Sequence, residues 1–184
     1  MYEKIISIGC DCGPATILRD FEVRDASYPF DWMVTMSTDG IANTLIDDFA
    51  GFLDVERKTV KESNTPKYVN KYDMRFTHHS GLTTSDLQQQ FNIKIARFRT
   101  SLKSNKVLLV RRLHSGETHC DETLDKLREA ILTLRERYSN EHIDCLVIAA
   151  CPACKHSVKE DEILKVVKTN VGDKPLKAVL KPYS

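Results

Sequence analysis

A cysteine between a short apolar run and a predicted helix is the first residue in this chain that could do chemistry. The run Ile5–Ile8 predicts a buried strand. Pro14 then favours a helix that begins just after Cys12, because the first turn of a helix tolerates proline. A thiol at a helix N-terminus meets free N–H groups and partial positive charge, which favour the thiolate. Cys12 is therefore a candidate nucleophile, although a small buried cysteine at a tight turn is the plainer interpretation.

Two adjacent histidines offer a base for such a nucleophile. The segment Tyr72–His78 alternates well enough to predict a strand or strand-like loop with Phe76 and His78 on one side. This alternation predicts that His78 faces inward toward Cys12 and that His79 points away. Neighbouring side chains of a strand point to opposite faces, so the histidine pair does not favour a metal site.

Three further residues could complete or line a site. Asp31 lies between two large aromatic residues, so its carboxylate is expected to be partly buried and to need a partner. That partner is expected to be the His78 imidazole or Arg111, while a structural role for Asp31 in capping a loop is equally open. Trp32, the only tryptophan, and His79 are candidate binding residues. Arg111 ends an apolar run, where it could bind a carboxylate or a phosphate, or pair with an acid of the chain itself.

These pieces together form a pattern that resembles an uncharacterised family named for papain-like cysteine peptidases. The matching pieces span about residues 6 to 150 and are Ser7-Ile8-Gly9-x-x-Cys12, Leu18-Arg19, Tyr28-Pro29-Phe30-Asp31-Trp32, Phe76-Thr77-His78 and the apolar run 107–111 that ends in arginine. The resemblance implies a Cys–His hydrolase with Cys12 on the family's cysteine position and His78 on its histidine position. An aspartate often follows that histidine in the family, whereas His79 stands there in this chain.

Apolar patterning along the chain predicts an α/β protein. Helices are expected within 38–49, 84–102, 118–138 and 158–168, strands within 106–113, 143–150 and 176–180, and an irregular surface segment over 54–72. The alternation favours a layered, largely parallel or mixed sheet with helices on both faces, whereas the resemblance implies a papain-like α+β fold. Ligands collect at the carboxyl ends of strands in an open α/β sheet. Cys12 follows one strand, Arg111 and Arg112 end another, and Cys151 follows a third, so these residues are expected to share that edge.

Length and composition are those of one globular domain spanning residues 1–184. The 27 basic and 26 acidic residues nearly cancel, which argues against nucleic acid or an anionic membrane as partner. No apolar run approaches the ~20 residues of a membrane helix. Six cysteines without a signal peptide favour reduced thiols in a cytoplasmic protein. The expected partner is a substrate, either a peptide or a small molecule, and no cofactor or metal is expected.

Two other functions stay open on the sequence alone. Cys151-Pro152-Ala153-Cys154 lies between a predicted strand and helix, as redox Cys pairs do, but only 30 residues follow it, too few for a thioredoxin-like sheet. With His156 and either Cys145 or Cys120 the same pair could bind zinc, although no second ligand pair at a matching spacing supports this. A non-catalytic binding protein would use the same sheet edge without chemistry.

Overall fold

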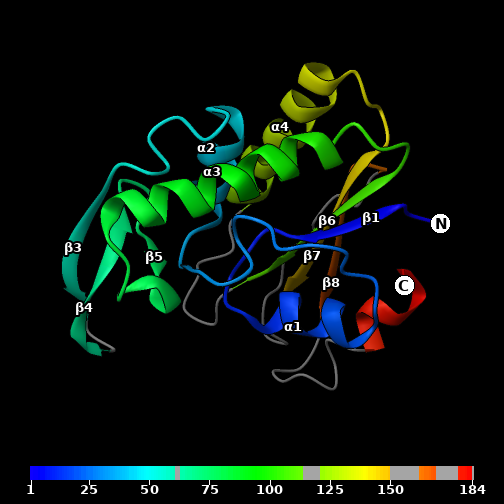
Figure 1. Ribbon diagram of the computed structural model, residues 1–184. Coiled ribbons are helices and arrows are strands. Elements are labelled where there is room, and N and C mark those ends of the chain that lie inside the picture. Colours follow the sequence, from blue (N-terminus) through cyan, green and yellow to red (C-terminus); the bar gives the residue numbers. More distant parts are fainter. Residues whose placement is uncertain (61–62, 114–120, 150–161, 169–177, 184) are drawn as a thin grey trace.

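Two four-stranded sheets organise the part of the chain that the structure describes (Figure 1). The computed structural model describes residues 1–60, 63–113, 121–149, 162–168 and 178–183. The first sheet is parallel and has the order β1-β6-β7-β8, with β1 Lys4–Ser7, β6 Val107–Arg112, β7 Ile143–Ala149 and β8 Leu164–Lys168. The second sheet is antiparallel and has the order β2-β5-β4-β3, with β2 Val34–Thr35, β3 Val55–Val60, β4 Ser63–Asn70 and β5 Met74–Phe76. The helices are α1 Gly13–Asp20, α2 Thr38–Ile46, α3 Thr84–Ser101 and α4 Asp121–Tyr138, with short 3₁₀ turns η1 Thr77–His79 and η2 Lys181–Tyr183.

Helices cover both faces of the parallel sheet, because its strands are apolar on both sides. Leu108 and Val110 of β6 belong to the core that contains Ile17 of α1. Leu109, which points the other way, belongs to the larger core that contains Ile131 of α4. Near-continuous apolar strands of this kind are typical of a parallel sheet buried between two helical layers. The predicted mixed α/β architecture is therefore confirmed.

An aromatic cluster lies against the antiparallel sheet and under α3. Its members pack mostly edge to face, with ring centroids 4.8 to 6.2 Å apart, and are Phe30, Phe49, Phe52, Phe76, Phe91 and Phe98. Such pairs contribute about 0.5–1.5 kcal/mol each beyond the burial of their area. The cluster fixes the loop that carries Phe30 and the turn that follows Phe76.

The two-residue strand β2 connects the sheets. Thr35 pairs with Met74 of β5, and its backbone N–H donates to the carbonyl of Cys10, 2.9 Å away, in the loop after β1. The loop that carries Cys12 and the turn that carries His78 therefore flank the same short strand.

Three elements differ from the sequence predictions. Residues 54–72 contain the hairpin β3–β4 instead of an irregular segment. The helix expected over 158–168 is wrong, because residues 164–168 form the strand β8, whose pairing with β7 outweighs an ambiguous apolar spacing. The strand expected over 176–180 is also wrong, since residues 178–180 are helical. No helix in the described ranges is both long and apolar enough to cross a bilayer.

Candidate active site

The loop between β1 and α1 has an unusual backbone. Gly9 and Cys10 have φ angles of +93° and +116°, and the second is rare for a residue that carries a Cβ. Such strain costs about 1–3 kcal/mol and persists only where neighbouring structure holds it; it is concentrated at functional sites. Here Thr35 holds it, because the N–H of Cys10 donates to Thr35 Oγ1, 2.8 Å away, and the N–H of Thr35 donates back to Cys10 O.

Arg111 holds Thr35 in place. The two hydrogen bonds between Thr35 and Cys10 are called the Thr35 clamp below. Arg111 Nη1 donates to Thr35 Oγ1 at 2.6 Å and its Nη2 to Thr35 O at 3.1 Å, while its Nε donates to Thr38 Oγ1 at 3.2 Å. The side chain is 0% exposed. The structure therefore places Arg111 behind the loop, closed to solvent, where it fixes the short strand to which Cys10 is bonded.

Cys12 lies where the sequence predicts, at the N-cap of α1. Its carbonyl accepts from the N–H of Thr16 at 2.9 Å, which starts the helix. The side chain is exposed, whereas Cys10 and Cys145 are buried. Burial raises the pKa of the Cys145 thiol to about 12, which leaves that thiol inert. Among the cysteines of the described ranges, Cys12 is the one that solvent and a substrate can reach.

Charged groups flank the start of α1. Asp11 Oδ1 accepts from the N–H of Gly13 at 2.9 Å, and Asp11 Oδ2 lies 3.4 Å from Arg112 Nη1. The first turn of α1 carries no acidic residue. Cys12 and Arg112 thus come from two neighbouring strand ends of the parallel sheet, as predicted, and Cys151 lies outside the described residues.

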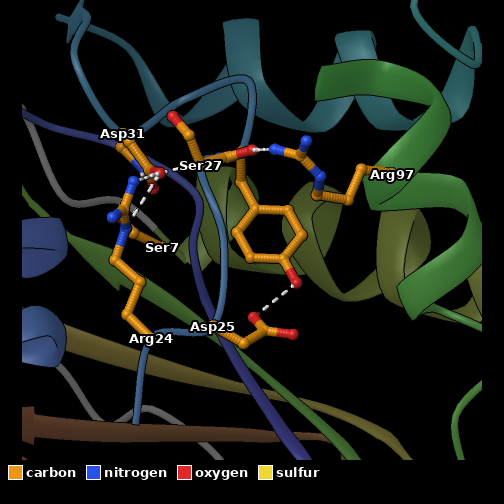
Figure 2. Close-up of polar contacts among 8 residues, drawn as sticks. Ser7, Arg24, Asp25, Ser27, Asp31 and Arg97 are labelled. Carbon is orange, nitrogen blue, oxygen red and sulfur yellow. Dashed lines mark hydrogen bonds and ion pairs between the residues drawn. The ribbon is translucent and has the colours of Figure 1, made fainter. Parts of the chain in front are cut away.

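Asp31 has a partner that the sequence did not indicate. The carboxylate is 1% exposed, and its Oδ2 accepts from Arg24 Nη2 at 2.7 Å, from Arg24 Nε at 3.2 Å and from the N–H of Tyr28 at 2.7 Å (Figure 2). Burial raises the pKa of the Asp31 carboxyl above its ordinary value, and the Tyr28 and Arg24 bonds oppose that rise. The expectation that Asp31 bonds His78 or Arg111 is wrong, since neither is a hydrogen-bond partner in the described part of the chain.

Arg24 links Asp31 to the aromatic residues beside the histidines. Its guanidinium carbon lies 5.6 Å from the centroid of the Trp32 ring, within the range of a cation–π contact. The Trp32 ring meets the His78 ring edge to face, with centroids 6.3 Å apart and an interplanar angle of 83°. Trp32 and His78, predicted from separate parts of the sequence, therefore touch.

The two histidines have exchanged the orientations that alternation predicts. The turn η1 interrupts the alternation after Phe76, so His78 is exposed and His79 is only 8% exposed. The His79 ring packs against Phe91, with centroids 5.0 Å apart, and its buried Nδ1 has no hydrogen-bond partner within the described structure. The inward orientation expected for His78 is therefore wrong.

Within the described residues, Cys12 and His78 are not hydrogen-bonded to each other. In the described ranges no hydrogen bond joins the Cys12 thiol to an imidazole, and the ring contact of His78 is the one with Trp32. The same ranges contain no group of three or more His, Cys, Asp or Glu side chains arranged to hold a metal ion. Cys151, Cys154 and His156 lie outside them.

The part of the chain that carries the Cys12 loop and the two histidines matches a known family. A family model with the description "Putative papain-like cysteine peptidase (DUF1796)" matches residues 3–151. The chain belongs to this family. No curated protein and no solved structure matches the chain. The match to the family covers both the Cys12 loop and the Trp32–His78 contact.

The sequence of this family member did not indicate that Arg24 and Thr35 contribute to the site. Arg24 lies in an irregular connector without motif or periodicity, and Thr35 lies in a strand of only two residues. Both act through contacts with residues distant in the chain or across a loop, which only the fold brings together. The one sequence signal for Arg24 was the requirement that buried Asp31 find a partner.

The burial of His79 predicts that the stability of this protein is sensitive to acid. Burial, with the nearby charges of Lys94 and His78, lowers the pKa of His79 from 6.5 to about 4. Between pH 6.5 and 4 the unfolded chain binds a proton at His79 that the folded chain does not, so stability falls as the pH is lowered. In urea unfolding measured from pH 7 to pH 4, the free energy of unfolding of His79→Gln should fall less steeply with decreasing pH than that of the wild type. His142→Gln, which changes an exposed histidine, should keep the slope, and an unchanged slope in His79→Gln contradicts the assignment.

Proposed function

We propose that this protein is a cysteine hydrolase with Cys12 as nucleophile and His78 as general base. The observation that carries the proposal is the exposed Cys12 thiol at the N-terminus of α1, at the end of a strained loop that Thr35 holds. Membership of a family named for cysteine peptidases supports the same chemistry. The substrate is a peptide or a small molecule with an acyl carbonyl, met in a cytoplasm that keeps thiols reduced.

The proposed reaction has two halves. His78 takes the thiol proton, the Cys12 thiolate attacks the carbonyl carbon, and the leaving group departs with a proton from the imidazolium. Water, deprotonated by His78, then cleaves the thioester and releases the acid. The N–H of Gly13 is held by Asp11 and Pro14 has none, so we assign the N–H of Cys12 as an oxyanion donor.

The reaction requires His78 to approach the sulfur. A working base must come within about 2.6–3.2 Å of the proton that it removes, and catalytic hydrogen bonds are often long before substrate binds. The exposure of His78 and its position on a single 3₁₀ turn leave room for such an approach. The contact with Trp32 sets the position of the His78 imidazole before substrate binds.

The proposal predicts an unusually reactive thiol. Iodoacetamide should alkylate Cys12 faster than the other five cysteines and well below pH 8, because its side chain is exposed and His78, in the proposed mechanism, takes its proton. In His78→Gln the rate of Cys12 alkylation below pH 8 should fall, because the base that takes the thiol proton is gone. Mass spectrometry of the labelled peptides gives the rate at each site.

A matched control separates this effect from a general loss of charge. His142→Gln removes an exposed histidine that precedes β7, at the amino-terminal ends of the parallel strands and away from Cys12, and should leave the Cys12 profile unchanged. If Cys12 is the slowest of the cysteines, or if His78→Gln leaves its profile unchanged, the Cys–His mechanism is wrong. A binding protein that uses the same sheet edge is then the better account.

A further inference from the structure

Arg24 occupies a junction between a buried acid and an exposed histidine. Its side chain is 13% exposed and forms an ion pair with Asp31 through two nitrogens. Its guanidinium also lies over Trp32, whose ring meets His78 edge to face. These three contacts form one continuous chain from Asp31 to His78.

We propose that Arg24 is a positioning residue that orients His78 through Trp32, an inference that rests on the proposed base role of His78. His78 is exposed, and no hydrogen bond in the described part of the chain fixes its ring. The indole of Trp32 therefore limits where the imidazole lies. Arg24 in turn limits where the indole lies, and Asp31 holds Arg24 in place. Asp31 thus acts on the histidine indirectly, without bonding to it.

The chemistry of the arginine side chain suits this role. The guanidinium is planar, so it can bond a carboxylate through its edge while presenting its face to an aromatic ring. A cation–π contact contributes about 0.5–2 kcal/mol, depending on burial, which is enough to favour one ring orientation. A lysine at position 24 keeps the charge but has no flat face and no fork, so it cannot make both contacts in this geometry.

The loop that carries these residues has other anchors, so the contribution of Arg24 can be separated from loop stability. Arg97 Nη1 donates to the carbonyl of Ser27 at 2.8 Å (Figure 2), and the hydroxyl of Tyr28 donates to Asp25 Oδ1 at 2.9 Å. The Tyr28 hydroxyl also lies 3.0 Å from Ser101 Oγ. Arg97 and Ser101 belong to α3, so these two contacts hold the loop to that helix, whereas the Tyr28–Asp25 bond lies within the loop.

The test is a double-mutant cycle with two readouts. The variants are Arg24→Lys, Trp32→Leu and the two combined. The first readout is the NMR chemical shift of the His78 ring protons, which the Trp32 ring current displaces. The second is the rate at which iodoacetamide alkylates Cys12.

Arg24→Lys should move the His78 shifts toward those of Trp32→Leu. It should also slow Cys12 alkylation at pH 7 roughly tenfold, since a 1 Å misplacement of a catalytic group can cost ~10²-fold in rate. In the Trp32→Leu background, Arg24→Lys should change neither readout further.

Arg97→Gln is the matched control, because it removes a loop anchor that does not touch Trp32. It should leave both readouts at the wild-type values. His78 shifts that stay unchanged in Arg24→Lys, change again in the Trp32→Leu background, or change equally in Arg97→Gln overturn the inference. Shifts that move as expected while Cys12 alkylation stays constant confirm the positioning chain and overturn the proposed Cys–His mechanism instead.

Discussion

Gly9→Ala should lower the free energy of unfolding by about 2–4 kcal/mol, combining a strained φ with overpacking. Gly9 has a φ of +93°, a conformation that residues with a Cβ rarely adopt. The added Cβ would lie 2.5 Å from Thr35 Oγ1 and 3.1 Å from Thr35 Cγ2. Thr35 cannot move aside cheaply, because the same Oγ1 accepts from Arg111 and from the N–H of Cys10. The loop must therefore shift, and Cys12 with it.

Two measurements check this outcome. Urea unfolding gives the loss of stability, and Cys12 alkylation should slow as the loop shifts. Gly81→Ala is the control, because a Cβ at Gly81 meets nothing within 4 Å, so its stability should stay within about 0.5 kcal/mol of the wild type. A Gly9→Ala protein as stable as Gly81→Ala contradicts the clamp described for Thr35.

The position of the candidate nucleophile could be predicted from sequence because its signals are local. An apolar run, a glycine and a proline within ten residues specify a strand, a turn and a helix start, and Cys12 lies between them. The same local reasoning predicted the parallel strands β6 and β7 from their apolar runs. These features depend on short-range backbone preferences and on burial, and the apolar runs in the sequence indicate which strands are buried.

The surroundings of the nucleophile could not be predicted, because they depend on contacts across the fold. Alternation placed His78 inward, but one 3₁₀ turn after Phe76 reversed the pair, and no residue type in that turn announces it. The partner of Asp31 proved to be Arg24, in a connector without pattern. Arg111 looked like an anion-binding residue at a strand end, yet it lies in β6 two positions after Leu109, on the same buried face of the strand. A shift by one residue in a strand changes which face a side chain occupies.

The burial of Arg111 leads to the second large effect. Arg111→Lys should destabilise the protein by about 2–4 kcal/mol, because hydrogen bonds from a charged group contribute about 1.5–3 kcal/mol and lysine cannot reproduce all three. The guanidinium bonds Thr35 Oγ1, Thr35 O and Thr38 Oγ1 at once from a fully buried position. An ammonium is a single point that can approach one of these oxygens closely, which leaves the others short of a donor.

The neighbouring arginine provides the control for this substitution. Arg112 forms an ion pair with Asp11, 3.4 Å away, and the side chain of that acid is 41% exposed. Partly exposed pairs of this kind contribute about 0–1 kcal/mol, so Arg112→Lys should change the urea midpoint little. Arg111→Lys should also loosen Thr35 and with it the left-handed backbone at Cys10, so Cys12 alkylation should slow in this variant. Equal stability of the two lysine variants would show that Arg111 does not hold the clamp, and the strained loop would then need another support.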